Sequence, residues 1–146
     1  MKTRHMRLLS VLLLTCMMSS MLCSFASASS QSSDYLSAYM AECHAVSNGK
    51  IVVTVDVDAL VNCTKVGADD IYLYESTDGV HFTLVRHYEY QDYPNMMGTG
   101  WYYYRDAVSY QGVPGRYYFA RVYVYAGNNT GYDRKFYDTA NVVAHT

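Results

Sequence analysis

The stretch GRYYFARVYVYAG, residues 115–127, predicts one long β-strand. Successive side chains of a strand point to opposite faces of a sheet, so its residues divide into two sets. The first set is small or apolar and suits a core: Tyr118, Ala120, Val122, Val124 and Ala126. The second set is aromatic and charged: Tyr117, Phe119, Arg121, Tyr123 and Tyr125. The strand therefore predicts one buried face and one tyrosine-rich outward face.

Short alternating runs separated by turn signals continue on both sides of this strand, a pattern typical of an all-β chain. Asn48-Gly49 and Asp78-Gly79 are strong hairpin signals, and QGVPG and AGNNTG are further turns. The predicted strands are residues 39–47, 51–60, 71–76, 80–90, 101–110, 115–127 and 134–144. Seven antiparallel strands predict a single β-sandwich domain spanning residues 39–146.

The N-terminal region, residues 1–28, predicts a helical secretory signal peptide. A basic start precedes the apolar run LLSVLLLTCMM, and Ala26-Ser27-Ala28 supplies small residues for cleavage after Ala28. A membrane anchor is the alternative, but the run is shorter than the ~20 apolar residues that a spanning helix needs. We expect a secreted, extracellular protein without a transmembrane anchor in its mature chain. Residues 29–38 are polar and Ser-rich and predict a flexible leader.

Charge and composition narrow the class of partner. Removal of the predicted signal peptide takes Lys2, Arg4 and Arg7 with it and moves the formal charge from −2 to −5. A mildly acidic chain without a basic cluster is a poor ligand for nucleic acid. We therefore expect no nucleic-acid partner.

Two cysteines, Cys43 and Cys63, stay in the predicted mature chain, and in an exported protein such a pair suggests a disulfide. A two-residue turn at Asn48-Gly49 argues against it, because it places Cys43 opposite Thr54. Cys63 would then lie roughly 25–30 Å away, against the ~5.5 Å between Cα atoms that a bridge requires. Two alternatives stay open: a bridge reached by a bend after Ala59, or two buried free thiols.

Three segments carry a resemblance to fibronectin type III domains. STDGVHFTLV, residues 76–85, resembles their hairpin between the third and fourth strands, in which an S-x-D-G turn precedes an inward aromatic residue, here Phe82. YYRDAVSYQGVPGRYYFARVYVYA, residues 103–126, is similar to the family's y-x-D … pG-x-x-Y-x-x-R-V-x-A passage, and residues 138–144 resemble its last strand. The matching residues are Asp106, Pro114, Gly115, Tyr118, Arg121 and Val122.

This resemblance implies a fibronectin III-like or immunoglobulin-like sandwich. The family's tryptophan on the second strand and its proline-rich start are missing. The layout of the chain also resembles a family of short, secreted, single-domain proteins of Gram-positive bacteria with no assigned function. That second resemblance implies a signal peptide, one sandwich and no known catalytic residues.

The histidines and cysteines predict no catalytic site. A nucleophile needs a base, and the base needs an orienting group. Cys43 and His44 are neighbours in sequence, so on a strand they point to opposite faces. We therefore expect a protein that is not an enzyme.

The spacing of the histidines and carboxylates in the sequence also predicts no metal site. His81 and His87 share a strand face, but six residues at ~3.3 Å each separate them by ~20 Å, too far for one ion. A calcium loop built from Asp56, Asp58 and Asn62, with Asp69-Asp70 across the loop, is the alternative. A straight strand sets the first two carboxylates ~7 Å apart, which suits a solvated face better than an oxygen cage. We expect neither a metal nor a cofactor.

The chain has 17 tyrosines, and all of them follow the predicted signal peptide. Sandwich topology would place the third, fourth, sixth and seventh predicted strands in one sheet, which brings two further tyrosines beside the long strand. The predicted binding face is Tyr72, Tyr74, Tyr117, Phe119, Arg121, Tyr123 and Tyr125. Cross-strand aromatic pairs stabilise a sheet by roughly 0.2–1 kcal/mol each, so a purely structural role is one interpretation.

A binding role is the other interpretation, because Tyr and Arg are enriched in interfaces. We expect a non-catalytic extracellular binding module that contacts an unknown protein through these rings. Glycan binding by the same rings is the alternative, with Asp138 and Asn141 as the nearest polar groups. A second aromatic run, Trp101 to Tyr104, predicts that Trp101 and Tyr103 fill one end of the sandwich, and a loop-borne binding edge is its alternative.

Overall fold

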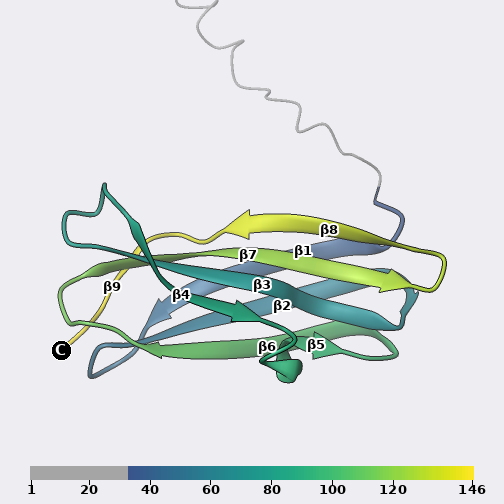
Figure 1. Ribbon diagram of the computed structural model, residues 1–146, viewed down its shortest axis with the longest axis horizontal. Helices are drawn as coiled ribbons and strands as arrows, with labels where there is room; N and C mark the ends of the chain where they lie inside the picture. The colour runs from purple at the N-terminus through teal and green to yellow at the C-terminus, as the bar shows by residue number, and fades with distance from the viewer. Residues whose placement is uncertain (1–32) are drawn as a thin grey trace, which may run out of the picture. The chain divides into compact units, whose positions relative to one another are not determined.

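A computed structural model describes residues 33–146, so the predicted signal peptide and its cleavage point at Ala28 lie outside the described residues. The described chain is all-β, with two antiparallel sheets that pack face to face like a sandwich (Figure 1). Within residues 33–146 the only helical element is the 3-10 turn η2 (Pro94–Met96). The strands are β1 (Leu36–Ala45), β2 (Lys50–Cys63), β3 (Lys65–Ser76), β4 (Thr83–Glu89), β5 (Met97–Gly98), β6 (Trp101–Gln111), β7 (Tyr117–Asn128), β8 (Gly131–Asp138) and β9 (Val142–Val143).

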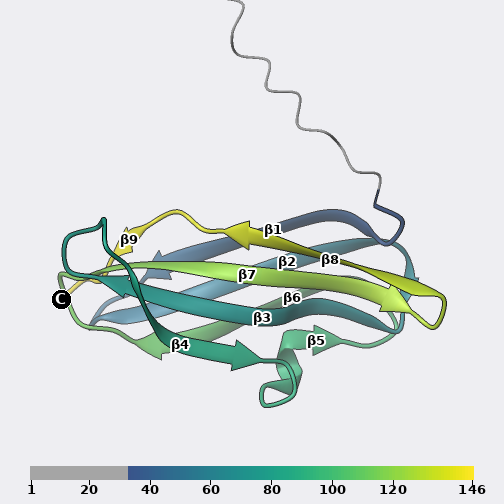
Figure 2. The same ribbon diagram turned by 45° about the horizontal axis from the view of Figure 1, so that its top comes forward.

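The strands divide between a three-stranded and a six-stranded sheet. The smaller sheet has the order β1-β2-β6. The larger has the order β4-β3-β7-β8, with β5 paired to β3 and β9 paired to β7. Figure 2 shows β3 and β7 side by side at the centre of the larger sheet, with β2 in the layer behind them. The larger sheet contains the four segments that we expected to share a sheet.

The core lies between the two sheets because the central strands alternate. On β2, the inward residues Ile51, Val53, Val55 and Val57 are all buried. On β7, Tyr118, Ala120, Val122 and Val124 have no measurable exposure. Burial of such apolar surface stabilises the fold by roughly 25 cal/mol per Å². The inward half of the long strand is therefore core, as its alternation predicts.

The β1–β2 hairpin has a different register from the predicted one. Val46 N–H donates to the Lys50 carbonyl at 2.7 Å, so the turn spans three residues, 47–49. Asn48 and Gly49 both have positive φ, 61° and 75°, which lets the chain reverse there. Cys43 consequently pairs with Val53 and not with Thr54. The predicted pairing was wrong because it set a core-facing side chain opposite an outward one.

Several strand bounds also differ from the predicted ones. β1 starts at Leu36, so the segment predicted as leader already forms strand at residues 36–38. The Asp133 carboxylate accepts hydrogen bonds from Tyr35 N–H and the Ser33 hydroxyl, at 2.7 and 2.5 Å, and these bonds anchor this start to β8. β3 starts at Lys65, six residues before the predicted start.

The predicted last strand, 134–144, is divided between β8 and β9. Between them Thr139 bonds twice to Ala120: its N–H donates to the Ala120 carbonyl, and its hydroxyl accepts from the Ala120 N–H, both at 2.9 Å. The hydroxyl thus takes the place of a backbone partner and ends the ladder of β8.

Both cysteines of the described region are free and buried. Burial raises the pKa of the Cys43 thiol to about 12. The Cys63 thiol donates to the Val61 carbonyl at 3.3 Å. The structure thus corresponds to the second of the two alternatives for this pair. Residues 33–146 contain no helix with the length and apolar character needed to cross a membrane.

Candidate functional site

The outward face of the larger sheet carries the predicted tyrosine-rich residues, and we call it the aromatic face. It consists of the outward side chains of β3, β4, β7 and β8. Strand pairing brings the predicted residues into neighbouring positions: Tyr74 lies opposite Phe119, and Tyr72 lies opposite Arg121. All seven predicted residues are half-buried, so the rings are not bare. They cover one another.

At one end of the face, two rings stack across strands. Tyr74 and Phe119 have ring centroids 4.9 Å apart and planes within 8° of parallel. Phe82 meets Phe119 edge-on, with centroids 4.8 Å apart. The prediction that Phe82 points inward was wrong, because its ring packs on the outward side of β7. This packing extends the aromatic face over the loop before β4.

The opposite end of the face is completed by β8. Tyr125 stacks on Tyr132 with ring centroids 5.2 Å apart, and the ring centroids of Tyr123 and Phe136 are 5.9 Å apart. Tyr132 and Phe136 are 62% and 55% exposed, well above the half-buried rings of β7. These two residues are not among the predicted binding residues. The alternation of Tyr132, Arg134 and Phe136 within one strand is the signal that would have found them.

Ion pairs lie between the rings. Arg121 forms a two-pronged contact with Asp138, at 2.7 and 2.8 Å, and its guanidinium carbon is 5.0 Å from the Phe136 centroid. The hydrogen bonds from Arg121 lower the pKa of Asp138. Arg134 lies over the Tyr123 ring at 4.2 Å. The face is therefore a mixture of rings and neutralised charges, and each of these arginines also makes a cation–π contact.

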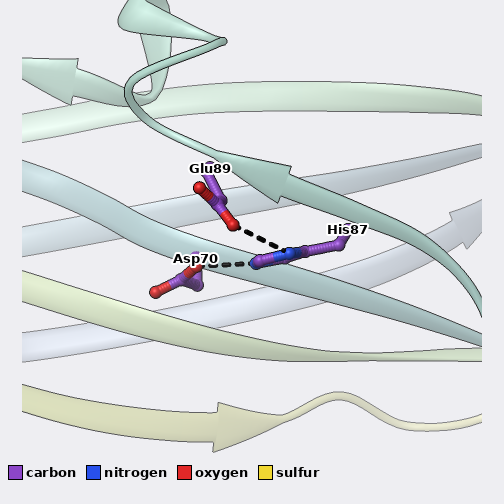
Figure 3. A group of neighbouring side chains, drawn as sticks. All are labelled: Asp70, His87 and Glu89. Atoms are coloured by element: carbon purple, nitrogen blue, oxygen red, sulfur yellow. Dashed lines mark hydrogen bonds and ion pairs between the residues drawn. The ribbon is translucent and has the colours of Figure 1, made fainter.

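His87 on β4 is the centre of a second group on the same face. Its ring stacks on Tyr72, with centroids 4.1 Å apart and planes 9° from parallel. Its Nε2 is 2.6 Å from Asp70 Oδ1, and its Nδ1 is 3.2 Å from Glu89 Oε1 (Figure 3). From the sequence, His87 was weighed as a metal ligand only together with His81. The spacing His87-x-Glu89 on one strand face was the available local signal.

The aromatic face therefore joins rings, arginines and one imidazole from four strands. Comparisons of the chain with protein-family models, curated proteins and solved structures find no match. A role for this face is therefore inferred from its own residues.

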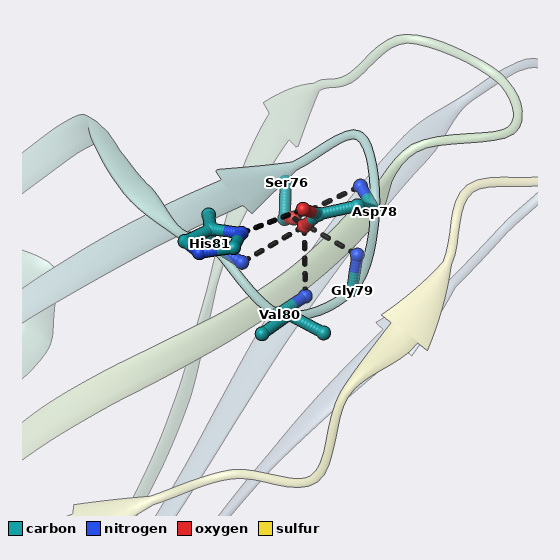
Figure 4. Close-up of polar contacts among 5 residues, drawn as sticks. All are labelled: Ser76, Asp78, Gly79, Val80 and His81. Atoms are coloured by element: carbon teal, nitrogen blue, oxygen red, sulfur yellow. Dashed lines mark hydrogen bonds and ion pairs between the residues drawn. The ribbon is translucent and has the colours of Figure 1, made fainter.

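Tyr117 lies at the edge of the face, beside the turn at residues 76–79. A Cβ atom on Gly79 would lie 3.4 Å from the Tyr117 ring. The Asp78 carboxylate holds the turn by accepting from the Ser76 hydroxyl and from the Val80 and His81 N–H groups, at 2.8–2.9 Å (Figure 4). The S-x-D-G segment thus forms a self-contained turn.

Three of the four carboxylates of the calcium alternative, Asp56, Asp69 and Asp70, are bonded to arginines. Asp56 accepts from Arg105 and, at 2.9 Å, from the Tyr103 hydroxyl, and the hydrogen bond from Arg105 lowers the pKa of Asp56. Asp69 and Asp70 both bond to Arg134, at 2.5 and 2.6 Å. The structure does not bring Asp56 together with Asp69 and Asp70 in a group of ligands within residues 33–146.

The second aromatic run is arranged differently from the prediction. Tyr103 points outward and is 48% exposed, so the expectation that it fills the end of the sandwich was wrong. Tyr104 packs against the core instead, and its hydroxyl donates to the Asn95 carbonyl at 2.7 Å. From Tyr103 to Tyr110 the alternation of β6 has the opposite phase to the predicted one, and the predicted position of the Trp101 side chain lies outside what the structure describes.

Histidines elsewhere in the described region also contact carboxylates. His81 Nδ1 is 2.7 Å from Asp78 Oδ2, and His44 Nε2 is 3.1 Å from Glu42 Oε2. Both groups are on the surface. Each of these two contacts involves a single carboxylate, whereas His87 lies between two.

Proposed function

We propose that this protein is a secreted, non-catalytic binding module that contacts a partner protein through its aromatic face. The observation that carries the proposal is the continuous surface of rings and arginines across β3, β7 and β8. Such side chains offer large, rigid contact area with polar ends, which is why Tyr and Arg are enriched in interfaces. Export is supported by the basic start, apolar run and small residues of the N-terminal sequence.

We also propose that the fold is fibronectin III-like or immunoglobulin-like. Seven strands of the described region have seven or more residues, and they lie in two antiparallel sheets. The buried Tyr118 supports the proposal, because its hydroxyl accepts from the Val113 N–H, five residues upstream, at 2.8 Å. A tyrosine that bonds back to the chain at this corner is a hallmark of immunoglobulin-like sandwiches.

Ring orientation favours a protein partner over a glycan. A sugar stacks on an open ring face, whereas Tyr74 and Phe119 cover one another's faces, as do Tyr125 and Tyr132. Glycan sites also use free polar side chains to fix hydroxyls. Of the two nearest candidates, Asp138 and Asn141, Asp138 is bound by Arg121. Glycan binding stays the alternative and needs its own measurement.

The test uses the two most exposed rings of the aromatic face. The double variant Tyr132→Ser, Phe136→Ser removes contact area without opening the core. Truncation of an interface centre costs about 2 kcal/mol or more, which is about thirtyfold in affinity. Chemical cross-linking of the secreted protein in its own culture would identify the partner, and titration with the purified partner would measure the dissociation constant.

A matched control changes two exposed apolar side chains of the smaller sheet, Met40→Ser and Tyr102→Ser. We expect the control to bind as the wild type does. If the aromatic-face variant also binds with unchanged affinity while both proteins stay folded, the face has a structural role only. Binding of the wild type to a glycan array, lost in the aromatic-face variant, would favour the glycan alternative.

A further inference from the structure

Three side chains with metal-binding atoms converge on the aromatic face, where β3 pairs with β4. They are Asp70, His87 and Glu89, and one ligand atom from each lies within 4.8 Å of the others (Figure 3). In the part of the chain that the structure describes, no other group of three His, Cys, Asp or Glu side chains meets this condition.

Strand register explains the convergence. Asp70 is directly opposite Glu89, and Tyr72 is directly opposite His87. Side chains two residues apart on a strand share a face, so all four point outward together. Directly opposed residues have Cβ atoms ~4.5–5.5 Å apart, and diagonal ones are still within reach of long side chains. The pairing of two strands, and not a loop, builds this group.

Neighbouring side chains fix the orientation of two of the three residues, Asp70 and His87. The Tyr72 ring stacks 4.1 Å from the imidazole and holds its plane. Arg134 Nη2 bonds to Asp70 Oδ2 at 2.6 Å, while Asp70 Oδ1 points at His87. Such outer contacts orient metal ligands in proteins and contribute to affinity.

The imidazole lies between two acceptors, which has a chemical consequence. Both ring nitrogens face carboxylate oxygens, so both donate only when the ring carries two protons. A metal ion needs one nitrogen free of its proton, so the ion and the proton compete for the same atom. The side chain of Glu89 is 48% exposed and can rotate to follow an ion.

We propose that Asp70, His87 and Glu89 bind a divalent transition-metal ion, with Zn²⁺ as the best match. One imidazole nitrogen and two carboxylate oxygens are ordinary zinc ligands, and water would complete a tetrahedral site. Mg²⁺ and Ca²⁺ prefer oxygen ligands alone, so they fit this set poorly. The site does not depend on the proposed protein partner.

The test is a calorimetric titration of the protein with ZnCl₂ and, separately, with MgCl₂. We expect one zinc ion per chain and no heat from magnesium. His87→Gln and Glu89→Gln should each weaken zinc binding by about tenfold or more.

His81→Gln is the matched control, because His81 contacts only the single carboxylate of Asp78. This variant should bind zinc as the wild type does. Circular dichroism and unfolding curves would show that each variant is folded. Absence of zinc binding by the wild type, or equal affinities for the wild type and His87→Gln, would overturn the proposal. Stronger binding of magnesium than of zinc would also overturn it.

Discussion

The Tyr118 hydroxyl accepts a hydrogen bond from the Val113 N–H, at 2.8 Å, on a side chain that has no exposure to solvent. The same hydroxyl donates to the carboxylate of Glu75, its register partner on β3. Burial and the bond to Glu75 raise the pKa of Tyr118 to about 12. One buried oxygen thus joins the β6–β7 corner to the C-terminal end of β3.

Tyr118→Phe keeps the ring and removes this oxygen. The Val113 N–H and the Glu75 carboxylate would each lose a partner, and an unpaired buried group costs about 1–3 kcal/mol. We expect the free energy of unfolding to fall by about that amount, measured by urea denaturation at neutral pH. Tyr137→Phe, at an exposed position of β8, is the control and should change stability little. Equal effects of the two substitutions would contradict this role of the hydroxyl.

Asp78 is expected to make the stability of the folded protein depend on pH in the acidic range. Hydrogen bonds from the His81 side chain and from backbone N–H groups hold the pKa of Asp78 well below its ordinary value of 3.8. Because the pKa of Asp78 is lower in the folded protein than in the unfolded chain, the ionised carboxylate stabilises the fold at every pH above the unfolded-state pKa. This contribution is lost as the pH falls through the folded-state pKa. Asp78→Ala should therefore destabilise the protein at neutral pH.

The pH profile separates this effect from general acid unfolding. We expect the difference in unfolding free energy between wild type and Asp78→Ala to shrink as pH falls below about 4. Urea denaturation of both proteins at a series of pH values measures it. Asp92→Ala, an exposed loop position, serves as the comparison. A difference that stays constant down to pH 2 would show that the turn does not need the ionised carboxylate.

The two buried thiols should be unreactive in the folded protein. Burial raises the pKa of both Cys43 and Cys63, and the thiolate is the reactive form. Iodoacetamide should leave both residues unmodified in the native protein and modify both in denaturant without reductant. Peptide mass mapping reads out each site. Modification that requires a reductant as well as denaturant would show a disulfide instead.

Local alternation in the sequence was enough to predict the two faces of β2 and β7. Val53 and Val122 are buried as predicted, because side-chain period 2 is a property of the strand itself. The half-buried state of Tyr72 and Tyr123 was harder to predict. Arg134 and Phe136 reach Tyr123 from β8, and His87 stacks on Tyr72 from β4.

Features that depend on register could not be predicted from local patterns. The turn at residues 47–49 differs from the expected one by a single residue, and that residue changes every pair of the hairpin. The group of Asp70, His87 and Glu89 depends in the same way on the pairing of residue 70 with residue 89. Each strand's sequence contains these side chains, but only the pairing of the two strands brings them together.

The stacked rings on the outer side of the larger sheet also bear on how readily a protease can cleave the chain. A protease must draw its substrate out as a single extended strand. β3 and β7 have a hydrogen-bonded neighbour on each edge, core on one face and rings on the other. Cleavage within them requires the sheet to open, so its rate follows the small population of open molecules. The rings on the outer face of the sheet would thus lengthen the lifetime of the chain in the presence of a protease.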